Sequence, residues 1–201
     1  MNYAICVSGA AAGRTVEPAH ELAEELGRAI VAKGHILTTG ATVGLPFFAA
    51  KAAKEAGGMS IGFSPASSLR EHVAKYRLPI GVFDFINFTG MHYVGRDVHL
   101  VQSSDALITV GGRFGSLHEF TTALGFRMPC GVLTGSGGTA DVIQELMEKL
   151  EPIHKDYVIF DDNPKRLVNR IIERLDAEYK DIDTKALSTQ WFMEKPHEHK
   201  G

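Results

Sequence analysis

The chain has 201 residues, of which 44% are hydrophobic and 22% are charged. This length and composition suit one globular α/β domain with a sizeable core and do not suit a two-domain enzyme. The formal net charge is −3 at pH 7, and no long block of lysine or arginine occurs. A nucleic-acid backbone is therefore not expected to be the main partner, although small anions can still bind locally.

The two cysteines and the absence of long apolar runs bear on the compartment. Cys6 and Cys130 lie in apolar, strand-like runs without Cys-x-x-Cys spacing, which predicts buried thiols in a reducing compartment. No run approaches the roughly 18 apolar residues of a membrane span, and Met1 leads directly into a predicted strand rather than a signal sequence. We therefore expect a cytoplasmic protein with no membrane partner.

Strand-like and helix-like runs alternate along the whole chain. The predicted strands span residues 3–8, 35–39, 60–63, 82–87, 106–110, 131–133 and 157–160. The predicted helices span about 18–33, 45–56, 93–102, 116–125, 139–150 and 164–179. Pro18 at a helix start, Gly34 past its end, and Asn163-Pro164 as cap and first turn are typical helix boundaries. The alternation predicts an α/β three-layer sandwich with a mainly parallel sheet of about seven strands and helices on both faces.

Two segments do not follow this alternation. Within residues 64–79, Ser67 to Tyr76 could form a short helix or an ordered loop, and such a segment beside a glycine turn is a candidate lid. Periodicity is lost after Asp181. We therefore predict one domain over residues 1–180 and a partly disordered tail over residues 181–201.

Three glycine-bearing turns follow predicted strands, at residues 8–13, 40–44 and 111–115. In a parallel sheet all three meet at the carboxyl edge, where ligands bind. Small residues there let the backbone approach a ligand, and the free N–H groups of a following helix favour an anion. The candidate phosphate- or nucleotide-binding residues are Ser8, Gly9, Gly40, Thr42, Gly44, Gly111, Gly112, Arg113, Phe114, Gly115 and Ser116.

Two common nucleotide motifs do not fit these turns. Gly9 and Gly13 are separated by three residues where a P-loop needs four, and Arg14 stands in place of its lysine. No Gly-x-Gly-x-x-Gly follows the first strand, and no acidic residue ends the second. The sequence therefore disfavours a nucleoside triphosphatase and a dinucleotide-dependent dehydrogenase.

Arg96 is the candidate cation of the site. It falls in the first turn of its predicted helix, where the positive end of the macrodipole costs a cation a few tenths of a kcal/mol or more. A bound phosphate would compensate through a bidentate contact of about 1.5–3 kcal/mol. The alternative is an exposed arginine paired with Asp97 or Asp84.

Glu119 also has two interpretations. Ser116-Leu117-His118-Glu119 matches the capping box, in which the glutamate folds back onto the backbone of the capping serine. The other interpretation is a catalytic carboxylate. His92, His99 and His118 show no metal-ligand spacing, so we expect no metal site.

Taken together, these features resemble the Lonely Guy family, whose members were long labelled possible lysine decarboxylases. The features are Arg96, Ser104-Asp105, the turn from Gly111 to Glu119 and the turn from Thr39 to Leu45. This family belongs with the molybdenum-cofactor carrier proteins among Rossmann-like nucleotide-binding proteins. The resemblance covers about residues 3–175, and Arg96 and Glu119 lie 23 positions apart, at the family's spacing.

The resemblance implies a Rossmann-like fold, a nucleoside 5′-monophosphate or related small phosphorylated ligand, and a homodimer or higher homo-oligomer. In members that are enzymes it implies hydrolysis of the N-glycosidic bond between base and ribose 5-phosphate, with Arg96 and Glu119 as catalytic residues. Gly112, Gly115 and Ser116 would then hold phosphate. A carboxylate can stabilise the oxocarbenium-like state of such a cleavage. No cofactor is required beyond a bound nucleotide or phosphate, and nothing suggests the pyridoxal phosphate site of a decarboxylase.

The chain also departs from the family at the site. Asp97 follows Arg96 where the enzymes usually have lysine, and Gly111-Gly112-Arg113 stands where they have Pro-Gly-Gly or Gly-Gly-Gly. Arg113 is either a new phosphate ligand or a residue that fills volume needed by the usual substrate. Two functions therefore stay open: a phosphoribohydrolase, or a non-catalytic carrier or sensor of a phosphorylated cofactor or nucleotide.

Overall fold

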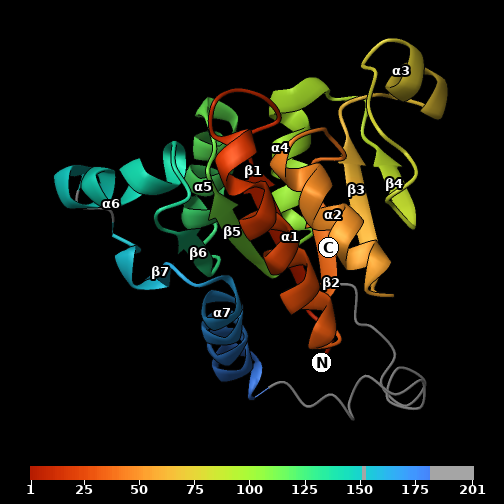
Figure 1. Cartoon of the computed structure of the whole chain (residues 1–201). Coiled ribbons are helices and arrows are strands. Elements are labelled where there is room, and N and C mark those ends of the chain that lie inside the picture. Colours follow the sequence, from red (N-terminus) through yellow and green to blue (C-terminus); the bar gives the residue numbers. More distant parts are fainter. Residues whose placement is uncertain (151–152, 182–201) are drawn as a thin grey trace, which may run out of the picture.

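A computed structural model describes residues 1–150 and 153–181, so the predicted tail after Asp181 lies outside the described residues. Seven strands form one sheet in the order β4-β3-β2-β1-β5-β6-β7, and each neighbouring pair is parallel. Helices cover both faces of this sheet (Figure 1). The predicted single-domain α/β sandwich is confirmed.

The elements alternate along the chain almost as the sequence predicts. The strands are β1 (Ala4–Gly9), β2 (Ile36–Thr39), β3 (Ser60–Ser64), β4 (Phe85–Phe88), β5 (Ala106–Val110), β6 (Cys130–Leu133) and β7 (Val158–Asp161). The helices are α1 (Val16–Ala32), α2 (Leu45–Glu55), α3 (Leu69–Ala74), α4 (His92–Gln102), α5 (Phe114–Gly125), α6 (Thr139–Leu150) and α7 (Pro164–Tyr179), with a 3-10 turn η1 (Lys155–Tyr157).

Several boundaries differ from the prediction by one to three residues, among them the starts of β4 and α1. Strand β4 begins three residues later than expected, because the Asp84 carboxylate accepts hydrogen bonds from the backbone N–H of Ser60, at 2.9 Å, and from Lys54. Helix α1 begins at Val16, so Pro18 is its third residue rather than its first.

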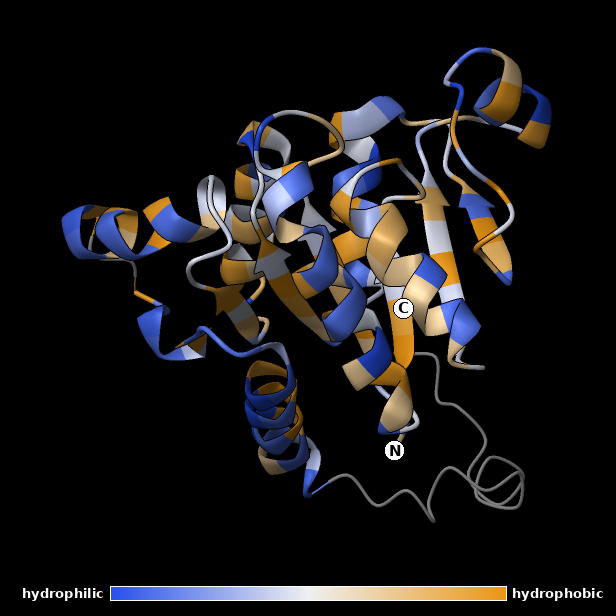
Figure 2. Cartoon of the chain, viewed as in Figure 1, coloured by the Kyte–Doolittle hydropathy of each residue, from blue (hydrophilic) through white to orange (hydrophobic). Residues whose placement is uncertain are grey.

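The core has two parts, one on each face of the sheet. Ile5 and Val7 of β1 pack with α1, α2 and α7, while Cys6 packs on the opposite face with α4, α5 and α6. This alternation follows from the two-residue period of a strand. Figure 2 shows the result, with hydrophobic colouring along the central strands and hydrophilic residues on the outer faces of the helices. Cys6 and Cys130 are free and buried, as predicted.

The position of β1 in the sheet decides where a ligand can bind. Strand β2 pairs with one side of β1 and β5 pairs with the other, so the strand order reverses at β1. In open α/β sheets such a reversal leaves a crevice beyond the carboxyl ends of the strands. Ser8 lies opposite Thr109 and Gly9 opposite Val110, so the turns after β1 and β5 leave the sheet at the same level.

Residues 64–79 form the short helix α3 flanked by turns, which is one of the two predicted forms. Buried His72 fastens this segment, because its Nδ1 lies 2.8 Å from Ser64 Oγ and its Nε2 lies 2.9 Å from the carbonyl oxygen of Pro79. A carbonyl only accepts, so Nε2 carries the hydrogen and the hydroxyl of Ser64 donates to Nδ1. That the segment acts as a lid stays a prediction.

The N-terminal cap of α7 gives a direct test of how local sequence fixes a helix. The Asn163 side chain accepts a hydrogen bond of 3.0 Å from the backbone N–H of Arg166, as the Asn163-Pro164 pattern predicts. We expect Asn163→Ala to lower the free energy of unfolding by about 1 kcal/mol, measured by urea denaturation. Asn169→Ala, at an exposed position inside the same helix, is the matched control and should be neutral or slightly stabilising. Equal losses in both variants would contradict the capping role.

Candidate functional site

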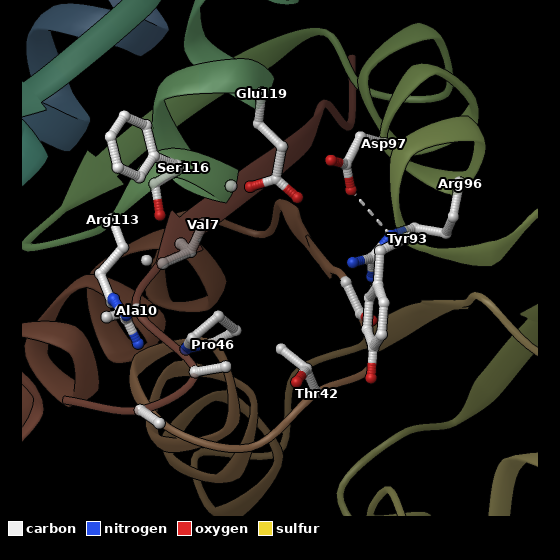
Figure 3. A pocket seen from close by; sticks show the side chains of 16 residues that line it. Val7, Ala10, Thr42, Pro46, Tyr93, Arg96, Asp97, Arg113, Ser116 and Glu119 are labelled. Atoms are coloured by element: carbon white, nitrogen blue, oxygen red, sulfur yellow. Dashed lines mark hydrogen bonds and ion pairs between the residues drawn. The ribbon is translucent and has the colours of Figure 1, made fainter. Parts of the chain in front are cut away.

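A pocket of about 330 Å³ opens at the carboxyl ends of β1, β2 and β5 (Figure 3). Its walls come from the loop after β1, the loop after β2, the start of α2, helix α4 and the start of α5. The volume lies at the lower end of the range for small-molecule pockets. The predicted site residues that line it are Gly9, Gly40, Thr42, Arg96, Arg113, Phe114, Gly115, Ser116 and Glu119.

The other four predicted site residues do not line the pocket, but they contact residues that do or form the turns that carry them. They are Ser8, Gly44, Gly111 and Gly112. Ser8 stands behind Glu119 and donates a hydrogen bond to its Oε2. Gly44 packs against the backbone of Ala10 and Ala11, so it fixes the turn rather than facing the pocket. Gly111 and Gly112 form the left-handed turn before α5, with φ of 56° and 108°. The N–H of Gly111 donates to Ser136 Oγ at 2.8 Å.

Helix α5 begins at Phe114, two residues earlier than the sequence predicts. Ser116 is therefore the third residue of the helix and not its cap, and Arg113 occupies the cap position without a side-chain cap bond. Because Glu119 bonds to Ser8 instead of folding back, the capping-box interpretation is wrong. The first intrahelical bond runs from Leu117 to Arg113, which leaves the N–H groups of the first turn free to bind an anion.

Arg113 adds a positive charge beside these N–H groups. Its side chain passes over Gly13, since a Cβ on that glycine would lie 3.5 Å from the Arg113 Cδ. Figure 3 shows Arg113 and the Ser116 hydroxyl on the same side of the pocket. Among residues 1–150 and 153–181, no carboxylate forms an ion pair with Arg113. This end of the pocket is therefore suited to an anion.

Arg96 is buried, with 4% of its surface exposed. Helix α4 starts at His92, so Arg96 is its fifth residue and the prediction that it lies in the first turn is wrong. Its Nη1 donates to the carbonyl oxygens of Gly40 and, at 2.8 Å, of Phe63. Arg96 therefore joins α4 to the turn that follows β2 and to the end of strand β3.

The close approach of this guanidinium requires glycine at position 40, because a Cβ there would overlap Arg96. Arg96 Nε also donates to Asp97 Oδ1 at 3.0 Å, so the predicted alternative of an Arg96–Asp97 pair is present, although buried. Asp84, the other predicted partner, bonds to Lys54 instead. Within the described part of the chain, Arg96 Nη2 has no acceptor. It can therefore serve a ligand.

Glu119 is the buried carboxyl group of the pocket wall, with 8% of its surface exposed. Burial is the main cause that raises its pKa from 4.5 to about 7; Arg96 and the hydrogen bond from Ser8 oppose this rise, and the negative charge of Asp97 adds to it. Near pH 7 this group is therefore divided between its protonated and ionised forms. A pKa near the working pH is the property that acid–base catalysis requires.

Among the charged and aromatic residues of the pocket wall, two were not identified as pocket residues from the sequence. Asp97 was noted only as a partner of Arg96 and as a departure from the family, and Tyr93 only as the start of its predicted helix. The Arg96 guanidinium carbon lies 5.9 Å from the centre of the Tyr93 ring, and Tyr76 packs edge-on at 5.6 Å. The signal was the spacing of three positions between Tyr93 and Arg96, which places both on one helix face.

Two further properties concern metal and membrane. In the described ranges, no three histidine, cysteine, aspartate or glutamate side chains gather as a metal site. None of the helices described is both long enough and apolar enough to span a bilayer.

Comparison with known proteins agrees with this geometry. Residues 2–168 match the SLOG cluster4 family. An uncharacterized protein of Archaeoglobus fulgidus is 35% identical over 114 residues, which are 56% of this chain and 69% of that protein.

Several solved structures share the fold of this chain. A molybdenum cofactor binding protein from Rippkaea orientalis is 26% identical, with a TM-score of 0.73 over 87% of this chain and 98% of that one. The molybdenum cofactor carrier protein of Chlamydomonas reinhardtii is 27% identical, with a TM-score of 0.69 over 88% and 99%. TM1055, at 22% identity, shares the fold with a TM-score of 0.73 over 87% and 99%. The resemblance to the Lonely Guy and molybdenum-cofactor carrier group is confirmed.

The pKa of Glu119 predicts how stability depends on pH. Between pH 4.5 and about 7 the folded protein holds a proton that the unfolded chain has lost, so the free energy of unfolding falls as pH rises through this window. The fall should be on the order of 2–3 kcal/mol. Urea denaturation at pH 5 and pH 8 should show this component in the wild type and not in Glu119→Gln.

The matched control is Glu173→Gln, the same change at an exposed position of α7. It should keep the pH dependence of the wild type. If the free energy of unfolding depends on pH in the same way in the wild type and in Glu119→Gln, the raised pKa of Glu119 is contradicted.

Proposed function

We propose, since the chain belongs to the SLOG cluster4 family, that its pocket binds a nucleoside 5′-monophosphate and hydrolyses the bond between base and ribose 5-phosphate. One observation carries this proposal: the polar groups lie in the order that such a ligand requires (Figure 3). Arg113 and Ser116 form one side, Tyr93 and Thr42 form the opposite side, and the carboxyl groups of Glu119 and Asp97 lie between them.

The first side suits the phosphate. The free N–H groups at the start of α5 and the positive helix end attract an anion, and Arg113 can form a charge-assisted pair with it. The opposite side suits the base, because Tyr93 offers an aromatic ring that Arg96 and Tyr76 hold in place. Stacking on such a ring favours a planar heterocycle.

The carboxyl groups between these two sides would meet the ribose. Hydrolysis breaks the bond between C1′ and the base nitrogen, adds the hydroxyl of water to C1′ and places a proton on the base. A carboxyl group with a pKa near 7 can exchange that proton, and carboxylates stabilise the oxocarbenium-like state. Glu119 is proposed as the catalytic carboxyl group, and Arg96 fixes the wall that holds it.

A second function is favoured by the comparisons. The proteins of Rippkaea and Chlamydomonas are described as molybdenum cofactor binding and carrier proteins. The same pocket in this chain would then hold a phosphorylated cofactor without cleaving it. Native mass spectrometry of the purified protein separates the two: a retained phosphorylated cofactor, together with no turnover, supports the carrier.

Assembly and location are also proposals. We propose a homodimer or higher homo-oligomer in the cytoplasm. Phe85 on the edge strand β4 and Val94 on α4 are 62% and 68% exposed, and apolar side chains of this size on a surface often mark a contact between subunits.

Arg113 provides the test of phosphate binding. Arg113→Ala should weaken the binding of AMP by at least about tenfold in calorimetric titration, because a charge-assisted contact is worth about 1.5–3 kcal/mol. Arg28→Ala removes an arginine from the exposed face of α1 and should leave the affinity unchanged. Equal affinities for the Arg113 and Arg28 variants would place the phosphate elsewhere.

The reaction is tested by incubating the protein with AMP, GMP, CMP and UMP and measuring free base and ribose 5-phosphate. We expect release from at least one of them. Glu119→Gln should lower kcat about 100-fold or more, because glutamine has a similar shape but transfers no proton. The Kd for AMP should change little. No release across the panel would contradict the enzymatic function.

A further inference from the structure

The two buried carboxyl groups of the pocket wall face each other (Figure 3). Glu119 extends from α5 and Asp97 from α4, and they are 8% and 5% exposed. Two negative charges in one poorly solvated place repel each other strongly, so one of the two groups keeps a proton over a wide pH range. The contacts around each group decide which one keeps it.

Asp97 is surrounded by hydrogen-bond donors. Arg96 Nε donates to its Oδ1 at 3.0 Å, and His118 Nδ1 lies 2.9 Å from its Oδ2. Oδ1 therefore accepts from a nitrogen that is always cationic, and Oδ2 lies beside an imidazole nitrogen that donates to it when it carries the hydrogen. The side chain of His118 is 39% exposed, so the hydrogen-bonded series from Arg96 through Asp97 to His118 reaches solvent at His118. These contacts leave both oxygens of Asp97 paired with nitrogen atoms rather than with a proton shared with Glu119.

Glu119 has a different environment. From β1, the Ser8 hydroxyl donates to its Oε2, and Cys6 presents a thiol whose pKa burial raises well above its ordinary value, so it stays neutral. From α4, Arg96 favours the ionised form of Glu119 while Asp97 opposes it. Burial is the largest effect and also opposes ionisation. Together, burial and Asp97 outweigh Arg96 and Ser8.

We propose that Asp97, paired with Arg96 and His118, directs the proton shared by the two carboxyl groups to Glu119. Asp97 is then a positioning residue that acts through Glu119. The chemical consequence rests on the proposed function. The Glu119 O–H gives its proton to the base nitrogen as the bond from that nitrogen to C1′ breaks. The water that bonds to C1′ returns a proton to the Glu119 carboxylate, so the group ends each turnover protonated.

The test follows the carboxyl carbon of Glu119 by carbon-13 NMR from pH 4 to pH 9 in the protein without ligand. The signal is assigned by its loss in Glu119→Gln. In Asp97→Asn we expect the proton dissociation constant of Glu119 to rise at least tenfold, since the neutral amide no longer repels a second charge. Asp156→Asn removes a distant charge and should leave the titration of Glu119 unchanged.

The wild-type titration already tests the proposal, whether or not Asp97→Asn folds. A midpoint near 4.5, the ordinary value of a glutamate, overturns it, and so does a midpoint that Asp97→Asn leaves in place. If the protein hydrolyses a monophosphate, the alkaline limb of its kcat profile should move to lower pH by at least one unit in Asp97→Asn. Absence of hydrolysis contradicts the proposed function and the acid role, while the titration still decides whether Asp97 holds the proton on Glu119.

Discussion

The buried guanidinium of Arg96 is the interaction on which the pocket depends. It binds the carbonyl oxygens of Gly40 and Phe63 and the carboxylate of Asp97, so it joins the ends of β2 and β3 to α4. A buried cation costs free energy unless nearby acceptors compensate for its lost hydration, so losing one of these three partners would destabilise the folded protein. Glycine at position 40 leaves room for the guanidinium, which occupies the space that a Cβ would take. Arg96 therefore connects the three segments that carry this wall of the pocket.

The sheet determines where the pocket lies, and the charged side chains that line the pocket determine its chemical character. The reversal of strand order at β1 opens a crevice in any fold of this kind, but it does not select a ligand. In the proposed function, the ligand is selected by the N–H groups at the start of α5 and Arg113 on one side of the pocket, and by Glu119 and Asp97 between the two sides. The enzymes of the Lonely Guy family, which this chain resembles, usually have lysine at the position of Asp97. A cation at that position would favour the ionised form of Glu119. Aspartate has the opposite effect, so the same fold can hold a different protonation state.

Much of the fold could be predicted from the sequence because alternating strand and helix periodicities are local signals. The cap at Asn163 and the strand from Ala106 to Val110 needed no long-range information. The start of α5 was misjudged, since Ser116 and Glu119 match a capping box in text while Glu119 bonds to Ser8, which lies 111 residues away. Burial of Arg96 and the ring position of Tyr93 likewise depend on packing between distant segments.

The central claim is that the start of α5 and Arg113 bind the phosphate of a nucleoside monophosphate whose ribose lies against Glu119. A crystal structure of the protein with AMP tests this most directly. We predict phosphate oxygens within hydrogen-bond distance of the backbone N–H groups of Gly115 and Ser116, with the Arg113 guanidinium paired to the phosphate. The adenine ring should lie beside Tyr93. A phosphate bound elsewhere, or a base at the α5 end of the pocket, would contradict the account.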